Sequence, residues 1–149
     1  MGAYGEDTGG SDAGAAYIFT RSGTSWSEQQ KIQASDKQAS DQFGRSVSIS
    51  DDGNTAIVGA YLEDTGATEE DTGVTDAGSA YIFTRSGTTW TQQRKIQASD
   101  KQAYDRFGWS VAISGDGETT IVGATHEDTV GAPTGASDTG AAYIYRYNF

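Results

Sequence analysis

The apolar and polar residues in the middle of the chain alternate with the period of two that is typical of β-strands. In the segment 43–50, Val47 and Ile49 alternate with serines and are predicted to lie on one face of a strand. Three more segments of strand character follow: 54–61, 78–86 and 88–98. Glycine-containing turns, such as the DDGN of 51–54, suit tight connections between antiparallel strands. Four antiparallel strands per unit are therefore predicted.

The same unit recurs at a spacing of 64 residues. Residues 14–50 align without a gap on 78–114 and are identical at most positions, and the Val-Gly-Ala of 58–60 returns at 122–124. A third copy begins with the GAAYIY of 140–145. A lone four-stranded sheet exposes both faces, so repeated sheets must stack to bury them. We predict an all-β fold of four-stranded antiparallel β-propeller blades, with about two blades per chain plus a spare third strand.

The strand pattern predicts three units along the chain. Residues 1–42 form a partial blade, with the end of a second strand followed by a third and a fourth strand. Residues 43–98 form a complete blade, and 99–149 form an incomplete blade that lacks its fourth strand. Two blades cannot close a ring, since propellers use about four to eight. The chain is therefore predicted to expose sheet faces and open edges, which favours association.

Two paired landmarks carry a resemblance to a known family. The FGRSVSIS of 43–50 and the FGWSVAIS of 107–114 are each followed by IVGA, and this pattern resembles the FG-GAP repeat of the propeller in integrin α-subunits and many secreted bacterial proteins. The resemblance implies extracellular adhesion or assembly, often with calcium in a D-x-D-x-D-G loop between the first two strands. The turns at 51–54 and 115–118 are too short to supply the oxygens of such a loop. Calcium is therefore not expected at those two turns.

The charge balance limits the classes of partner. Ten Lys and Arg against 21 Asp and Glu give a net charge of −11, which repels a phosphate backbone and predicts no nucleic-acid partner. No apolar run is long enough to span a bilayer, so no membrane insertion is expected. The MGAY at the start has neither region of a signal peptide, which indicates a mature segment or an excised piece. Without cysteine, the redox compartment cannot be read.

Acidic clusters recur between the predicted second and third strands. EDTG stands at 6–9, 63–66 and 70–73, and EDTV stands at 127–130. We interpret 63–69 as a local tandem duplication, because 70–78 aligns on 6–14 at the repeat spacing. Carboxylates in glycine-rich loops suit weak calcium sites, and the alternative is that they only stabilise turns. The candidate ligands are Asp7, Asp12, Asp71, Asp76, Asp128 and Asp138.

Catalytic chemistry finds little support in the sequence. His126 is the only histidine, and no cysteine or nucleophile motif accompanies it. Tyr104 and Trp109 replace a serine and an arginine of the first copy, which predicts variable exposed positions able to hold a glycan. Five aromatic residues recur at strand positions and are predicted to pack in the core: Tyr17, Trp26, Tyr81, Trp90 and Tyr143.

These patterns favour a non-enzymatic structural or adhesive protein, extracellular or at the cell surface. We expect the chain to form a homo-oligomer head to tail, with the strands around 14–34 completing the unfinished blade at 107–147 of a neighbour. Such a contact gives a ring or a filament, and a closed ring would have six or eight blades. Two alternatives stay open: a glycan-binding, lectin-like propeller, and a fragment of a longer FG-GAP propeller.

Overall fold

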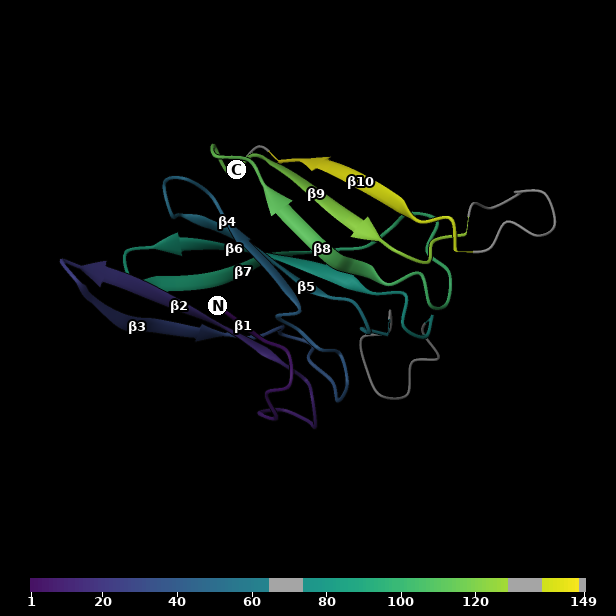
Figure 1. Ribbon diagram of the computed structural model, residues 1–149, viewed down its shortest axis with the longest axis horizontal. Helices are drawn as coiled ribbons and strands as arrows, with labels where there is room; N and C mark the ends of the chain where they lie inside the picture. The colour runs from purple at the N-terminus through teal and green to yellow at the C-terminus, as the bar shows by residue number, and fades with distance from the viewer. Residues whose placement is uncertain (65–73, 129–137, 148–149) are drawn as a thin grey trace.

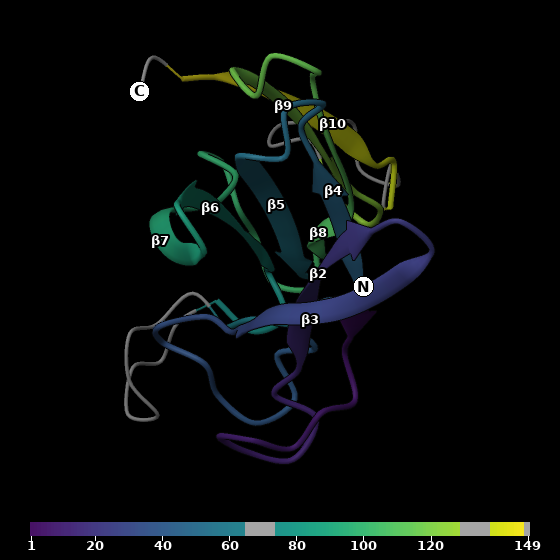
Figure 2. The same cartoon turned by 90° about the vertical axis from the view of Figure 1, so that its left-hand side faces the viewer.

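A computed structural model describes residues 1–64, 74–128 and 138–147, and within these ranges the secondary structure is all β. Ten strands form three antiparallel sheets, and the sheet in the middle of the sequence also lies between the other two in space (Figures 1 and 2). The all-β, blade-like fold class is therefore confirmed. The described residues contain no helix long and apolar enough to cross a membrane.

The central blade has four strands, joined in chain order from edge to edge. They are β4 (Ser46–Ile49), β5 (Thr55–Ala60), β6 (Ser79–Ser86) and β7 (Thr89–Ile96). Gly87 has φ +62° in the β6–β7 turn, a conformation that glycine adopts without strain. In the β4–β5 turn, the Asp52 carboxylate accepts hydrogen bonds from Ser50 Oγ (2.6 Å) and the Asn54 backbone N–H (2.9 Å). Local hydrogen bonds therefore close this hairpin.

The terminal blades have three strands each. The N-terminal blade contains β1 (Gly2–Ala3), β2 (Ala15–Ser22) and β3 (Ser25–Ile32), in that order. The C-terminal blade contains β8 (Phe107–Ile113), β9 (Thr119–Ala124) and β10 (Ala141–Arg146), with β9 in the middle. Figure 1 shows these blades on opposite sides of the central blade. Relative to the central blade, the N-terminal blade lacks a first strand and the C-terminal blade lacks a fourth.

Two apolar cores lie between the three blades. In the first, Phe43 makes edge contacts with Tyr81 at 5.5 Å and Phe83 at 6.0 Å between ring centroids. In the second, Phe107 contacts Tyr143 and Tyr145 in the same way, at 5.4 and 6.1 Å. Each core joins one face of a blade to the opposite face of the next blade. The interface between neighbouring blades is therefore itself a repeated unit of the structure.

The Phe-Gly and Gly-Ala landmarks lie where these blades approach most closely. The backbone N–H of Gly44 donates to the carbonyl of Gly59 (3.0 Å). A Cβ atom at Gly59 would lie 2.0 Å from the carbonyl oxygen of Gly108, in the next blade. No side chain fits at that distance, so glycine is required there for the first strands to pack.

Candidate functional site at the open faces of the terminal blades

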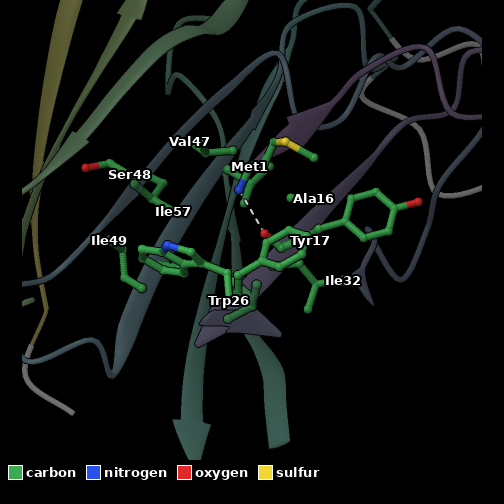
Figure 3. Close-up of a pocket in the computed structure, with 13 residues that line it drawn as sticks. Met1, Ala16, Tyr17, Trp26, Ile32, Val47, Ser48, Ile49 and Ile57 are labelled. Atoms are coloured by element: carbon green, nitrogen blue, oxygen red, sulfur yellow. Dashed lines mark hydrogen bonds between the residues drawn. The ribbon is translucent and has the colours of Figure 1, made fainter. Parts of the chain in front are cut away.

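An apolar groove of about 540 Å³ separates the N-terminal blade from the first strands of the central blade. Its lining includes Met1 and Trp26 on one side and Val47 and Ile49 of β4 on the other (Figure 3). Val47 is 42% exposed and Ile49 is 50% exposed, although both are apolar strand residues. The groove occupies the position of the first strand and most of the second strand that the N-terminal blade lacks.

The equivalent positions in the C-terminal blade show what normally covers β4-type residues. Val111 and Ile113 of β8, 64 residues after Val47 and Ile49, pack against the core that contains Ile57 of β5. In the N-terminal blade, the strand equivalent to β5 is β1, which pairs with β2 only through Gly2 and Ala3. Val47 and Ile49 therefore share one face, as predicted, but that face has no second strand beneath it.

The outer face of the N-terminal blade exposes aromatic residues whose counterparts are buried. Trp26 is 65% exposed and Trp90 is 4% exposed, although both stand near the start of a fourth strand. Trp90 is covered because its Nε1–H donates to Gln29 Oε1 (2.9 Å) and its backbone N–H donates to Gln30 Oε1 (2.7 Å), both in the preceding blade. The prediction of a core role is therefore wrong for Trp26, which has no preceding blade in this chain.

The outer face of the C-terminal blade exposes a pair of isoleucines. Ile121 of β9 and Ile144 of β10 are directly opposite in the ladder and are 44% and 71% exposed. Their counterparts in the central blade, Ile57 and Ile82, form the same cross-strand pair and are fully buried against the next blade. An unpaired apolar face therefore ends the stack at this side as well.

Charged residues follow the same repeat. In the central blade, Lys95 forms ion pairs with the buried Glu63 and with Asp36 Oδ2 (2.7 Å), and Ser79 Oγ donates to Glu63 Oε2 (2.5 Å). In the N-terminal blade, the equivalent lysine, Lys31, pairs with Glu6 Oε1 at 2.7 Å. The fourth strand thus supplies a cation to the glutamate that follows the second strand.

The C-terminal blade has this glutamate but no such lysine. Glu127 is 4% exposed and forms no ion pair with any described residue. Burial raises the pKa of Glu127, and the nearby carboxylates of Asp100, Asp105 and Asp128 raise it further. The hydroxyl group of Tyr143 donates to Asp100 Oδ1 (2.8 Å) beside it. Glu127 therefore stands as a buried acidic group at the edge where the fourth strand is missing.

The acidic loops use one carboxylate in the same way in each copy. Oδ1 of Asp7, Asp64 and Asp128 accepts the backbone N–H of Asp12 (2.9 Å), Asp76 (2.8 Å) and Asp138 (2.5 Å), respectively. The acceptor for Asp76 is Asp64, whereas Asp71 lies outside the described residues. Side-chain to backbone bonds of this kind hold turns, and Asp12, Asp76 and Asp138 each have φ near +50°.

The position of Glu63 corrects the alignment of these loops. The Glu63 carbonyl accepts the Gly78 N–H (3.0 Å), as Glu6 accepts from Gly14 (2.8 Å) and Glu127 from Gly140 (3.0 Å). The first EDTG copy, at 63–66, therefore begins with the repeated contacts, and its assignment to the inserted duplication was wrong. Sequence alone left the two copies equivalent, because only hydrogen bonding to Gly78 distinguishes them.

The described residues do not offer a calcium cage of the kind the resemblance implies. They contain no group of three or more His, Cys, Asp or Glu side chains placed to hold a metal ion. At the β8–β9 turn, Asp116 Oδ1 accepts from Ser114 Oγ (2.5 Å) and the Glu118 N–H (3.0 Å), which lowers the pKa of Asp116. The hairpin carboxylates therefore serve as turn acceptors in this structure.

The predicted glycan-binding residues occupy different surroundings. Trp109 makes an edge contact with Tyr61 at 4.8 Å, and the Arg45 guanidinium lies 4.7 Å from the Trp109 ring centroid. Tyr104 is 56% exposed in the preceding loop, with φ +71°. No contact between Tyr104 and Trp109 is recorded in the described part of the chain. His126 shares a hydrogen bond with the Thr125 hydroxyl group (2.8 Å).

Comparison with known proteins supports the repeat assignment. The family model described as FG-GAP repeat matches residues 26–83 and 90–145, which together exceed half of the chain. No curated protein matches the chain significantly. The two matched segments each run from the fourth strand of one blade to the third strand of the next.

Proposed function

Because the chain belongs to the FG-GAP repeat family, we propose that it is a non-enzymatic extracellular structural or adhesive protein that self-assembles head to tail. The proposal has the unfinished C-terminal blade of one copy and the N-terminal blade of the next combine into one complete blade. Repeats of this family are typical of extracellular proteins and are generally non-enzymatic, which supports the location and the class.

One observation carries the proposal: each apolar position that is buried between blades inside the chain is exposed at the terminal blades. Trp26 and Ile121 are 65% and 44% exposed, whereas Trp90 and Ile57 are 4% and 0% exposed. The N-terminal blade exposes the face that normally receives a preceding blade, and the C-terminal blade exposes the face that receives a following one. The two surfaces are therefore complementary in the same sense as the internal interfaces.

The geometry of such a contact is heterologous, because two different surfaces meet. Heterologous contacts close into rings if the rotation per subunit closes, and run on as filaments if it does not. Each chain contributes two blades, so a closed ring would contain six or eight blades. Burying the exposed parts of Trp26, Val47, Ile49 and Ile121 would contribute about 4–6 kcal/mol. This gain is comparable to the cost of association, so assembly is expected at micromolar concentrations.

Light scattering across a concentration series tests the proposal. We expect mass to rise with concentration in the micromolar range, and Trp26→Ser to shift the rise to at least tenfold higher concentration. Tyr104→Ser is the matched control, since it removes an exposed aromatic residue of the same chain and should leave assembly unchanged. A monodisperse monomer throughout would refute self-assembly, as would a longer native chain whose further blades cover both faces.

A glycan-binding role is the second candidate, favoured by the aromatic residues around Arg45. Tyr4, Tyr61 and Trp109 all lie within 6 Å of its guanidinium, which forms a polar and aromatic surface of the kind that can hold a sugar ring. A glycan array would favour this role if binding were lost in Trp109→Ala. Uniform absence of binding would remove it.

A further inference from the structure

We propose that the β2–β3 hairpin of a second copy takes the place of β10 on the edge of β9, and that its Lys31 pairs with Glu127. This inference rests on the proposed assembly and identifies the strand that the incoming copy replaces. The C-terminal strand β10 is then a placeholder in the free chain, and Glu127 is the recognition site for the partner's lysine.

The first support is that β2 and β10 are interchangeable in sequence and register. Residues 15–18 and 141–144 are both Ala-Ala-Tyr-Ile. In β2, Ala16 pairs with Gly2 and Ala15 pairs with Ala3; in β10, Ala142 pairs with Gly123 and Ala141 pairs with Ala124. β1 thus reproduces the end of β9, and it stops after two residues. Beyond Tyr17, which is bonded to Met1, β2 has no strand on that edge in the described structure.

The second support is that β2 brings a fourth strand and β10 does not. β2 pairs with β3 from Ala16 to Ser22. Within the described residues, β10 pairs with β9 alone. Exchange of β10 for the hairpin would convert the three-stranded sheet into the four-stranded order of the central blade, and would cover the open edge of β2. The exchanged blade therefore satisfies more backbone groups than either terminal blade does separately.

The third support is the fit of side chains on both faces. With β9 paired to β2 of the next copy, Ile121 would lie over Val47 and Ile49 of that copy, as Ile57 lies beneath Val111 and Ile113 within this chain. The groove of about 540 Å³ would be filled by the partner's β8 and β9. Simple stacking of intact terminal blades would leave this groove empty, so the groove favours strand replacement over stacking.

The fourth support is the missing cation. Lys95 of β7 pairs with Glu63 and Asp36, and the equivalent acids of the C-terminal blade are Glu127 and Asp100. Lys31 of the incoming β3 occupies the position of Lys95 in the completed blade. Its own partner, Glu6, is the counterpart of Glu127, so one glutamate must yield the lysine to the other. Glu127 is the better partner because it is buried, which strengthens the attraction between the two charges.

Matched glutamate variants test the lysine transfer in the full chain. We expect Glu127→Gln to raise the apparent dissociation constant of assembly at least tenfold, because a buried charged hydrogen bond is lost. Glu6→Gln removes the competing partner and should leave assembly unchanged or tighter. The double variant Lys31→Gln/Glu127→Gln should be no weaker than Lys31→Gln alone. Equal effects of the two glutamate variants, or additive effects in the double variant, would overturn the inference.

A disulfide lock tests the displacement of β10. Arg146 and Thr119 are opposite each other at the end of the β9–β10 ladder, and the chain has no native cysteine. In Thr119→Cys/Arg146→Cys, we expect the oxidised chain to lose assembly at least tenfold and the same chain to regain it on reduction. Equal assembly of both forms would overturn strand replacement while leaving head-to-tail assembly standing. A wild-type chain that stays monomeric would instead refute the proposed function itself.

Discussion

The central blade and the terminal blades are built from nearly the same sequence, yet they differ in what their residues do. Tyr81 and Trp90 of the central blade are buried, whereas Trp26 of the N-terminal blade is largely exposed. Lys95 bridges two blades, whereas Lys31 reaches only the glutamate of its own blade. The difference shows that a residue of this repeat acquires its role from the neighbouring blade. The predictions below test that statement, from the largest expected effect to the smallest.

The tryptophan pair should show the largest contrast. In dilute, monomeric protein, Trp90→Ala is expected to lower the free energy of unfolding by about 3–5 kcal/mol, because it leaves a cavity between two blades. Trp26→Ala should change it by less than about 0.5 kcal/mol, since the side chain is exposed. Urea denaturation measures both, and Trp90→Phe provides a milder variant should the alanine protein fail to fold. Equal losses at the two sites would contradict the comparison.

The lysine pair comes next. Lys95→Met leaves Glu63 buried without its cation, and we expect a loss of about 2 kcal/mol at neutral pH. The loss is limited because Glu63 can take up a proton, its pKa being raised by burial already. Lys31→Met removes a more exposed pair and should cost less than about 1 kcal/mol in the monomer. Denaturation at pH 5 and pH 8 checks both, and the Lys95→Met loss should be smaller at pH 5.

Asp41 should give the molecule a pH dependence. It is 3% exposed, and burial raises its pKa to about 7, with Glu63 and Asp36 raising it and the Gln38 N–H bond (2.6 Å) and Lys95 opposing the rise. Because the folded-state pKa lies above the unfolded value, the contribution is full below about pH 4 and is lost as pH rises towards 7.

We expect a decrease of about 1–2 kcal/mol over this pH interval. Each unit of pKa shift corresponds to about 1.4 kcal/mol, reduced here as water reaches the ionised loop. Asp41→Asn keeps an acceptor for the Gln38 N–H and should flatten the curve between pH 4 and pH 7. A stability curve that falls equally steeply in this variant would assign the pH dependence to other carboxylates.

Calcium should produce the smallest effect. In the described loops, Asp7, Asp64 and Asp128 each use a carboxylate oxygen to hold a backbone N–H. We therefore expect the same Tm in millimolar calcium and in chelator, for the wild type and for Asp71→Asn/Asp76→Asn. A rise in Tm with calcium that disappears in the double variant would establish the calcium site that the sequence left open.

The sequence by itself determined the fold class, and the reason is local. The period of two at 43–50, the glycine turns and the repeat spacing of 64 residues depend on backbone preferences that each segment carries alone. The recurrence of the same unit then required stacked sheets, because an isolated sheet cannot bury two apolar faces. The resemblance to FG-GAP repeats rested on the same short landmarks.

Only the tertiary structure decided which copies of each residue are buried, bonded or free. Trp26 and Trp90 have nearly the same sequence neighbours, so no local pattern could show that one is covered by a preceding blade and the other is not. The repeat pattern contained a signal for the unmatched Glu127, since the equivalent lysine would lie beyond residue 149. Its burial without a cation became visible only when the blades were in place, because burial and charge pairing depend on contacts between sheets.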